Sequence, residues 1–297
     1  MKSAFLTLMI TVSACSPVEA QHRSAKLLHA AGRGNVLVAA HRGGYSNDRL
    51  DRAPENSLAN LKLAIQKRYD VYETDIQRTS DGVFVIVHDP TLVRETNGSG
   101  TVKDKTLAEL KTLNKRYRDR TLSEERVVTL EELLEAGKGR ILFKPDLKPG
   151  IINHFEELAH LITKLQMTDH VFLRTGFKDV KTIHALFDNG CPKVKVMFKA
   201  KNEAQVRIAI QKFQPKTIQI DVAKGEKISD SKAAAIELAV RNGVLVETHI
   251  YQDSDQWQKL AKLGVRMFHT STPDTAIQFL ETNGWRKDLV TKINSAQ

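Results

Sequence analysis

The chain has 297 residues, of which 41% are hydrophobic and 27% charged, a composition typical of a globular protein with a sizeable core. Its formal net charge of +10 fits nucleic acid, an anionic membrane surface or a phosphate-bearing substrate as partner. Because the sequence has no arginine- or lysine-rich block, no aromatic residues within a basic strip and no zinc-ligand spacing, nucleic acid is the least favoured of the three. The length allows one large domain or two small ones, and the oligomeric state is not indicated.

Residues 1–20 predict an export signal that is not part of the fold. Lys2 is followed by a mostly apolar run over 4–14, which is too short to cross a bilayer as a helix. The run ends in Val12-Ser13-Ala14-Cys15, which resembles the lipobox of bacterial lipoproteins, whose cysteine is lipidated. Ordinary cleavage after Ala20 is the alternative. We expect an exported protein of the bacterial envelope, periplasmic and anchored to a membrane through Cys15, so that Cys191 has no disulfide partner.

The first predicted strand, over 36–40, ends abruptly in His41, Arg42, Gly43 and Gly44. Five small or branched apolar residues in a row are typical of a buried parallel strand. The glycines allow a sharp turn, which holds the two polar side chains at the end of the strand. A histidine transfers protons near neutral pH and an arginine binds phosphate, so His41 and Arg42 are candidate site residues. A strand that happens to end in two polar residues is the alternative.

A helix is expected to open at 52–57, which includes Pro54 and Glu55, and a second strand is expected over 71–76. Glu73 and Asp75 are two residues apart and therefore share one face of that strand. Two neighbouring carboxylates repel each other and are costly to bury unless a cation joins them. The pair thus indicates a cation site, with a solvent-facing edge strand as the alternative.

The dipeptide Asp81-Gly82 predicts a hairpin turn, and the apolar strand over 83–87 after it again ends in a histidine, His88. The following residues depart from a simple alternation of strands and helices, with short helices expected at 107–113 and 130–136. We interpret residues 81–139 as an insertion laid over one end of a single domain that spans 24–297.

From residue 140 the alternation is regular. Strands are expected at 140–143, 171–174, 194–198, 218–222, 244–249 and 265–269, each followed by a helix. With the strands at 36 and 71 this makes eight strand–helix units, which predict an α/β fold of the (β/α)₈ TIM-barrel type with an insertion after the second strand. A doubly wound open sheet is the alternative, but no Gly-x-Gly-x-x-Gly motif follows the first strand.

Asp146 and Lys148 follow the strand at 140 and share a face, although Asp146 could instead cap the next helix. In a barrel the carboxyl ends of the strands converge on one mouth. Three carboxylates without a cysteine favour Mg²⁺ or Ca²⁺, and two histidines beside the cation provide a proton acceptor and a proton donor. This combination suits cleavage of a phosphodiester. The residues gathered there would be His41, Arg42, Glu73, Asp75, His88, Asp146 and Lys148.

The sequence resembles the glycerophosphodiester phosphodiesterases over residues 36–282. The matching motifs are His41-Arg42-Gly43, Pro54-Glu55-Asn56-Ser57, Glu73-x-Asp75, Asp81-Gly82 and His88-Asp89. The resemblance implies a TIM barrel with an insertion after the second strand, and a metal-dependent enzyme that releases an alcohol and sn-glycerol 3-phosphate from small or lipid-derived phosphodiesters. It also implies catalytic roles for His41 and His88, metal ligation by Glu73, Asp75 and Asp146, and a place for Glu55 at or beside the metal.

Three positions depart from the family pattern. Asp146 stands where the family has Glu, Glu247-Thr248-His249-Ile250 replaces Trp-Thr-Val-Asn, and Thr270-Ser271-Thr272-Pro273 replaces Thr-Asp-x-Pro. Glu247 and His249 share a face of their strand, so we expect them to bind an alcohol more polar or more cationic than glycerol. A rim ion pair between Glu247 and a Lys or Arg is the alternative. For the function, the alternatives are a sphingomyelinase D-like or lysophospholipase D-like enzyme and a phosphodiester-binding lipoprotein with little turnover.

Overall fold

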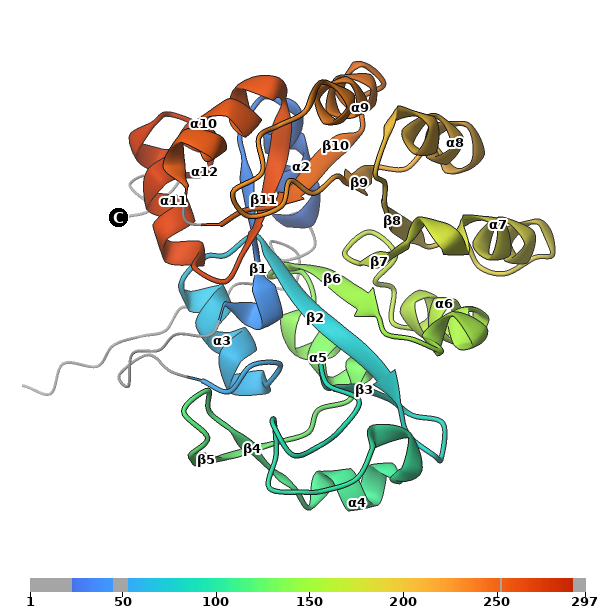
Figure 1. The fold of residues 1–297 in the computed structure, drawn as a ribbon. Helices are drawn as coiled ribbons and strands as arrows, with labels where there is room; N and C mark the ends of the chain where they lie inside the picture. Colours follow the sequence, from blue (N-terminus) through green and yellow to red (C-terminus); the bar gives the residue numbers. More distant parts are fainter. Residues whose placement is uncertain (1–22, 45–52, 252, 291–297) are drawn as a thin grey trace, which may run out of the picture.

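The computed structural model describes residues 23–44, 53–251 and 253–290. Eight parallel strands form a barrel in the order β1-β11-β10-β9-β8-β7-β6-β2, and pairing of β1 with β2 closes it (Figure 1). The predicted (β/α)₈ barrel is therefore confirmed, and the open sheet is wrong. The strands are β1 (Leu37–Ala40), β2 (Val71–Arg78), β6 (Leu142–Leu147), β7 (Phe172–Gly176), β8 (Lys195–Lys199), β9 (Thr217–Gln219), β10 (Leu245–His249) and β11 (Val265–Thr270).

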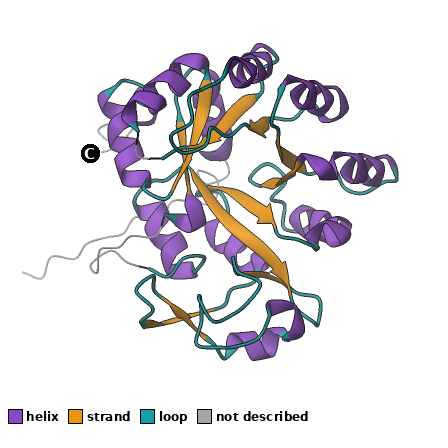
Figure 2. Ribbon diagram, viewed as in Figure 1, coloured by secondary structure: helices purple, strands orange, loops and turns teal. Residues whose placement is uncertain are grey.

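Helices surround the strands on the outside (Figure 2). Several begin at a side chain that accepts a hydrogen bond from the first turn, as Ser57 does from the backbone N–H of Asn60. No helix in the described ranges is long and apolar enough to span a membrane. The barrel helices are α3 (Leu58–Gln66), α5 (Leu130–Gly137), α6 (Phe155–Lys164), α7 (Val180–Asp188), α8 (Glu203–Phe213), α9 (Asp230–Arg241), α10 (Ser254–Leu263) and α11 (Pro273–Thr282), and α12 (Lys287–Val290) follows them.

The interior of the barrel is apolar at its base and charged at its mouth. Inward-facing and outward-facing side chains alternate along each strand. On β6 the inward-facing residues Leu142, Lys144 and Asp146 therefore follow one another toward the mouth. The base contains Leu37, Leu142 and Met267, and α2 (Arg23–Gly32) contributes Leu27 to the same apolar cluster. The helix thus closes the end of the barrel opposite the mouth.

The insertion follows β2 and has a small core of its own. It begins with β3 (Phe84–Ile86), which pairs antiparallel with β2 as the Asp81-Gly82 hairpin predicted, and Gly82 adopts a φ of 89°. It continues through η2 (Val102–Asp104), α4 (Leu107–Lys111), β4 (Asn114–Arg116) and β5 (Leu122–Arg126). Its apolar cluster consists of Val85, Val87, Leu92, Val102, Leu110 and Val127. The leucines of α5, which was predicted as part of the insertion, belong instead to the main core.

Strand β2 lies in the middle of the barrel wall. It pairs with β1 on one side and with β6 on the other, and Glu73 and Asp75 are buried. The edge-strand interpretation of the two carboxylates is therefore wrong. Their burial at the mouth requires positive charge nearby.

Candidate active site

The carboxyl ends of the strands enclose a cavity of about 160 Å³ at the barrel mouth. Seven residues predicted from the sequence line it: His41, Glu73, Asp75, His88, Asp146, Lys148 and His249. Arg42 and Glu55 lie beside this cavity and interact with each other, whereas Glu247 does not line it. The barrel thus brings together residues that are up to about two hundred positions apart in the chain.

The turn after β1 places His41 at the cavity. Residues His41–Gly43 form η1, in which Arg42 has a φ of 49° and Gly43 a φ of 81°. A Cβ at Gly43 would lie 1.5 Å from Oδ1 of Asn60, so only glycine fits there. The His41 ring is held through Nδ1, which lies 2.8 Å from Oγ of Ser271, leaving Nε2 for a substrate. Burial, opposed by the charge of Glu73, lowers the pKa of His41 and favours its neutral form.

Three carboxylates on neighbouring strands form the best candidate metal centre. Glu73, Asp75 and Asp146 each offer an oxygen within 4.8 Å of those of the other two. Burial raises the pKa of Asp146, and the charges of Glu73 and Asp75 add to this, while Arg174 opposes it. Lys148 Nζ lies 2.8 Å from Asp75 Oδ1, and Arg174 donates to Asp146 over 2.7 Å. A cluster of hard oxygen donors whose mutual repulsion a cation relieves fits Mg²⁺ or Ca²⁺.

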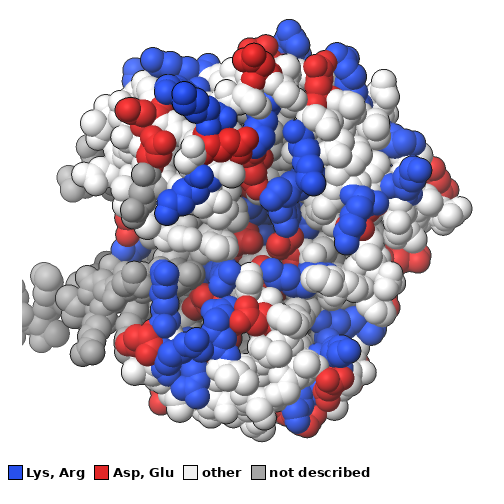
Figure 3. Space-filling view, viewed as in Figure 1, with Lys and Arg blue, Asp and Glu red and all other residues white. Residues whose placement is uncertain are grey.

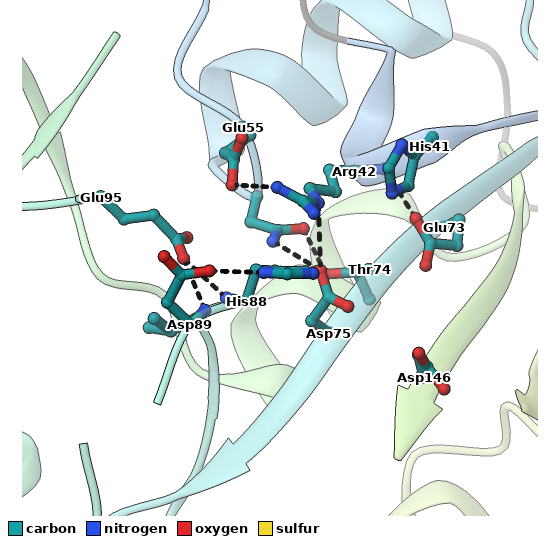
Figure 4. A network of polar contacts seen from close by, with 12 residues as sticks. His41, Arg42, Glu55, Glu73, Thr74, Asp75, His88, Asp89, Glu95 and Asp146 are labelled. Carbon is teal, nitrogen blue, oxygen red and sulfur yellow. Dashed lines mark hydrogen bonds and ion pairs between the residues drawn. The ribbon is translucent and has the colours of Figure 1, made fainter. Parts of the chain in front are cut away.

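A chain of charged contacts connects the two sides of the mouth, and Figure 4 shows its two ends, Arg42 with Glu55 and His88 with Asp89. Glu55 Oε1 accepts from Arg42 over 3.0 Å and from Arg94 over 2.8 Å. Arg94 Nε donates to Asp89 over 2.5 Å, and the other oxygen of Asp89 lies 2.6 Å from Nδ1 of His88. The Arg94 hydrogen bond lowers the pKa of Asp89 to about 2 despite partial burial, so Asp89 is ionised. It therefore fixes the His88 ring and leaves Nε2 exposed to the cavity.

Glu55 does not face the three metal-centre carboxylates directly. Burial would raise the pKa of Glu55, but the hydrogen bond from Arg94 and the charges of Arg42 and Arg94 outweigh it and lower this pKa. Glu55 is therefore an ionised group that positions the two arginines. The backbone N–H of Arg42 in turn donates to Glu73 over 2.7 Å, which orients that carboxylate.

Sequence reasoning missed several residues that line the cavity: Lys144, Arg174, Lys199, Gln219, Asp221 and His269. A signal existed, because all of them follow the inward-facing period of two of their strands, either within the strand, as Lys144 and Arg174 do, or near its end. His269 is the least expected, since burial lowers its pKa well below the usual range and neither ring nitrogen has a hydrogen-bond partner. Its Nε2 lies 3.5 Å from Glu73 Oε2.

Glu247 and His249 have different surroundings although they share a face of β10. Glu247 is fully buried below the cavity, where Oε1 accepts from Lys144 over 2.7 Å. The pairing with a lysine, left open as an alternative, is thus present, but inside the barrel and not at the rim. His249 reaches the cavity, stacks on Tyr251 and lies 4.6 Å from the ring of His269.

The fold and the residues at its mouth define a phosphoric diester hydrolase built on a TIM barrel. A family model described as "Glycerophosphoryl diester phosphodiesterase family" matches residues 41–275. The match covers most of the chain, including His41, His88 and all three carboxylates. The chain therefore belongs to the glycerophosphoryl diester phosphodiesterase family.

Similar proteins agree with this assignment. A glycerophosphodiester phosphodiesterase of Caldanaerobacter subterraneus subsp. tengcongensis is 28% identical over 264 residues, covering 84% of this chain and 99% of the relative. One of Bacillus subtilis is 27% identical, covering 82% and 88%. A solved glycerophosphoryl diester phosphodiesterase structure from Parabacteroides distasonis has a TM-score of 0.73 at 20% identity, covering 88% of this chain and 92% of that one. An Oleispira antarctica phosphodiesterase in complex with the product sn-glycerol-3-phosphate has a TM-score of 0.64 at 23% identity, covering 84% and 99%. The two solved structures confirm the fold.

Proposed function

We propose that this chain hydrolyses glycerophosphodiesters to an alcohol and sn-glycerol 3-phosphate, with a divalent cation held by Glu73, Asp75 and Asp146. The observation that carries the proposal is that His41 and His88 line the same small cavity as the three carboxylates. Each ring is fixed through Nδ1, by Ser271 and by Asp89. The names of the curated relatives and the sn-glycerol-3-phosphate complex of the Oleispira antarctica protein support this substrate class.

The residues of the chain divide the chemistry as follows. When bound, the cation neutralises charge on the phosphoryl oxygens and polarises the phosphorus. Arg42 and Lys148 contribute fixed positive charge beside it. The neutral imidazole of His41 accepts at Nε2 a proton from the attacking water, whose oxygen forms the new bond to phosphorus as the bond to the alcohol oxygen breaks. His88 then donates a proton from Nε2 to the oxygen of the departing alcohol, while Asp89 keeps its ring in place.

The choice between Mg²⁺ and Ca²⁺ is decided by the size and rigidity of the donor set. We infer that the cation binds the three carboxylates in place of the contacts that Lys148 and Arg174 now make with Asp75 and Asp146. The test is to remove metal with EDTA and to restore activity with each ion in turn. Full activity in EDTA would contradict the metal centre.

For the alcohol, we propose a group more polar than glycerol. The far wall of the cavity is formed by Lys199, Gln219, Asp221 and His249, which offer several hydrogen-bonding atoms and no aromatic platform of the tryptophan type. Glu247 is bonded to Lys144 and does not contribute to this wall. Asp221 is itself paired with Lys199 over 2.6 Å, so the wall favours polar over purely cationic groups.

The test is hydrolysis of a panel of glycerophosphodiesters, lysolipids and sphingomyelin, with and without each cation. We expect metal-dependent release of alcohol from glycerophosphodiesters. Cleavage of lysolipids or sphingomyelin alone would favour the sphingomyelinase D-like or lysophospholipase D-like alternative. Tight binding of substrate without metal-dependent release would favour a binding lipoprotein.

We also propose that the protein is exported and anchored to an envelope membrane through Cys15, although this residue lies outside the described part of the chain. The support is the lipobox-like Val12-Ser13-Ala14-Cys15 behind a short apolar run. Cys15→Ser should abolish acyl labelling and release the protein from membranes. A mature protein that begins at Gln21 by intact mass would contradict the anchor.

A further inference from the structure

A second cavity, of about 170 Å³, lies on the insertion next to the active site. Figure 3 shows Lys and Arg side chains gathered over β4 and β5. The cavity shares Glu55 and Arg94 with the network that reaches His88, but it contains none of the residues that line the catalytic cavity. Its lining residues are Glu55, Arg94, Glu95, Arg116, Tyr117, Arg118 and Arg120.

The two acids in this lining are already neutralised. Glu55 Oε1 accepts from both Arg42 and Arg94. Glu95 Oε1 accepts from Arg94 over 2.9 Å and from two backbone N–H groups over 2.9 and 2.8 Å. Its other oxygen lies 3.6 Å from the ammonium of the fully buried Lys115. Neither acid is therefore available to neutralise the remaining arginines.

Two arginines of the β4–β5 hairpin, Arg116 and Arg120, keep their positive charge. Arg116 is held in place by the backbone carbonyls of Thr96 and Arg120, over 2.7 and 2.8 Å, which are uncharged acceptors. Within the described ranges no carboxylate forms an ion pair with Arg116 or Arg120. Arg120 has a φ of 73°, which lies in the left-handed region that glycine adopts without strain. The turn therefore carries a guanidinium at a position where the backbone conformation favours glycine.

We infer that this cavity is a second phosphate-binding site, which holds a phosphoryl group other than the one that is hydrolysed. Guanidinium groups present several N–H donors in a planar fork that matches phosphate oxygens. Arg116 is fixed by hydrogen bonds before a ligand arrives, which lowers the entropic cost of binding. The cavity has room for several water molecules, and therefore for a phosphoryl group. The same chemistry serves a soluble phosphomonoester and an anionic lipid headgroup.

The experiment is a calorimetric titration of the full chain with inorganic phosphate, without substrate, so that it does not depend on turnover. Three proteins are compared: wild type, Arg120→Gln, and Arg116→Gln/Arg120→Gln. Because Arg116 supports the hairpin through Thr96, the single Arg120→Gln variant guards against loss of structure. Arg241→Gln/Lys262→Gln is the matched control, because it also removes two positive charges, from exposed positions on α9 and α10.

We expect wild type and the control to bind phosphate at two classes of site, and the insertion variants to lose one class or weaken it by about tenfold. The value of kcat for glycerophosphocholine should be the same in Arg120→Gln as in wild type, because Arg120 does not reach the catalytic cavity. Unchanged phosphate binding in Arg120→Gln and in the double variant would overturn the inference. Absence of glycerophosphodiester turnover in wild type would overturn the proposed function alone.

Vesicle binding identifies the source of the phosphate. Each variant is prepared in a Cys15→Ser background and sedimented with phosphatidylglycerol or phosphatidylcholine vesicles. Binding to phosphatidylglycerol that falls about tenfold in the insertion variants, but not in the control, supports the site with a lipid headgroup as its ligand. Loss of inorganic phosphate binding without any change in vesicle binding supports the site with a soluble ligand.

Discussion

Removal of the Glu247 carboxylate should destabilise the barrel strongly and leave substrate choice unchanged. Glu247 and Lys144 have side chains that are 0% and 1% exposed, and their charged atoms are 2.7 Å apart. Glu247→Leu leaves the Lys144 ammonium buried without its partner, which costs about 3–5 kcal/mol of the free energy of unfolding. Lys144→Met/Glu247→Leu, which removes both charges, should recover most of this loss. The control Glu131→Leu breaks an exposed pair with Lys164 and should cost less than about 1 kcal/mol.

Urea unfolding followed by circular dichroism measures these differences. The ratio of kcat/KM values for glycerophosphocholine and glycerophosphoglycerol should be the same in Glu247→Leu as in wild type, because Glu247 does not reach the cavity. A loss below about 1 kcal/mol in the single variant, or a double variant that is as unstable as the sum of the two singles, would refute the reasoning. A changed ratio in a protein of normal stability would return Glu247 to substrate recognition.

Three further predictions follow from the site. His41→Ala and His88→Ala should each lower kcat by about 10²–10⁴ without shifting the urea midpoint, and near-normal turnover would exclude that histidine from proton transfer. Chelation should lower both activity and melting temperature, and Asp146→Asn should weaken metal activation; a melting temperature indifferent to EDTA would contradict the carboxylate centre. Burial and the charge of His41 lower the pKa of His249 from 6.5 to about 4, so between these values the unfolded chain binds a proton that the folded chain does not. The free energy of unfolding should therefore decrease as the pH is lowered through this window, by about 1.4 kcal/mol per pH unit. His249→Gln should reduce the slope of the urea midpoint against pH, and an unchanged slope would contradict this assignment to His249.

His41, His88 and two of the three carboxylates at the mouth could be predicted from the sequence because the ends of strands have a recognisable pattern. An apolar run that stops at a histidine marks both the strand and the point where it reaches the mouth, as at His41 and His88. Glu73 and Asp75 were placed on one face by the period of two, which is a local property of an extended chain. Eight repetitions of strand and helix then predicted the barrel, because eight such units over this length match a (β/α)₈ fold.

Only the tertiary structure decided which charges meet. Lys144 and Glu247 are 103 positions apart, and their contact depends on the closure of the barrel, which lets β6 and β10 face each other across its interior. The same closure turned a carboxylate predicted to contact substrate into a buried structural partner. It also brought Arg174 and His269 to the carboxylates of β2 and β6. Such pairings depend on strand register and barrel stagger, which a single strand's periodicity does not encode.

The sequence by itself determined the alternation of strands and helices and the candidate site residues that lie at the ends of strands. Both follow from local periodicity and turn chemistry. The place of α5 in the ring of helices and the arginine-lined cavity of the insertion were decided by packing between distant segments. Arg94 and Arg116 come from different segments of the insertion, and Glu55 precedes both by about forty residues or more. Their shared cavity exists because the insertion folds back onto the barrel mouth, where long-range contacts, and not local sequence, select the neighbours of each charge.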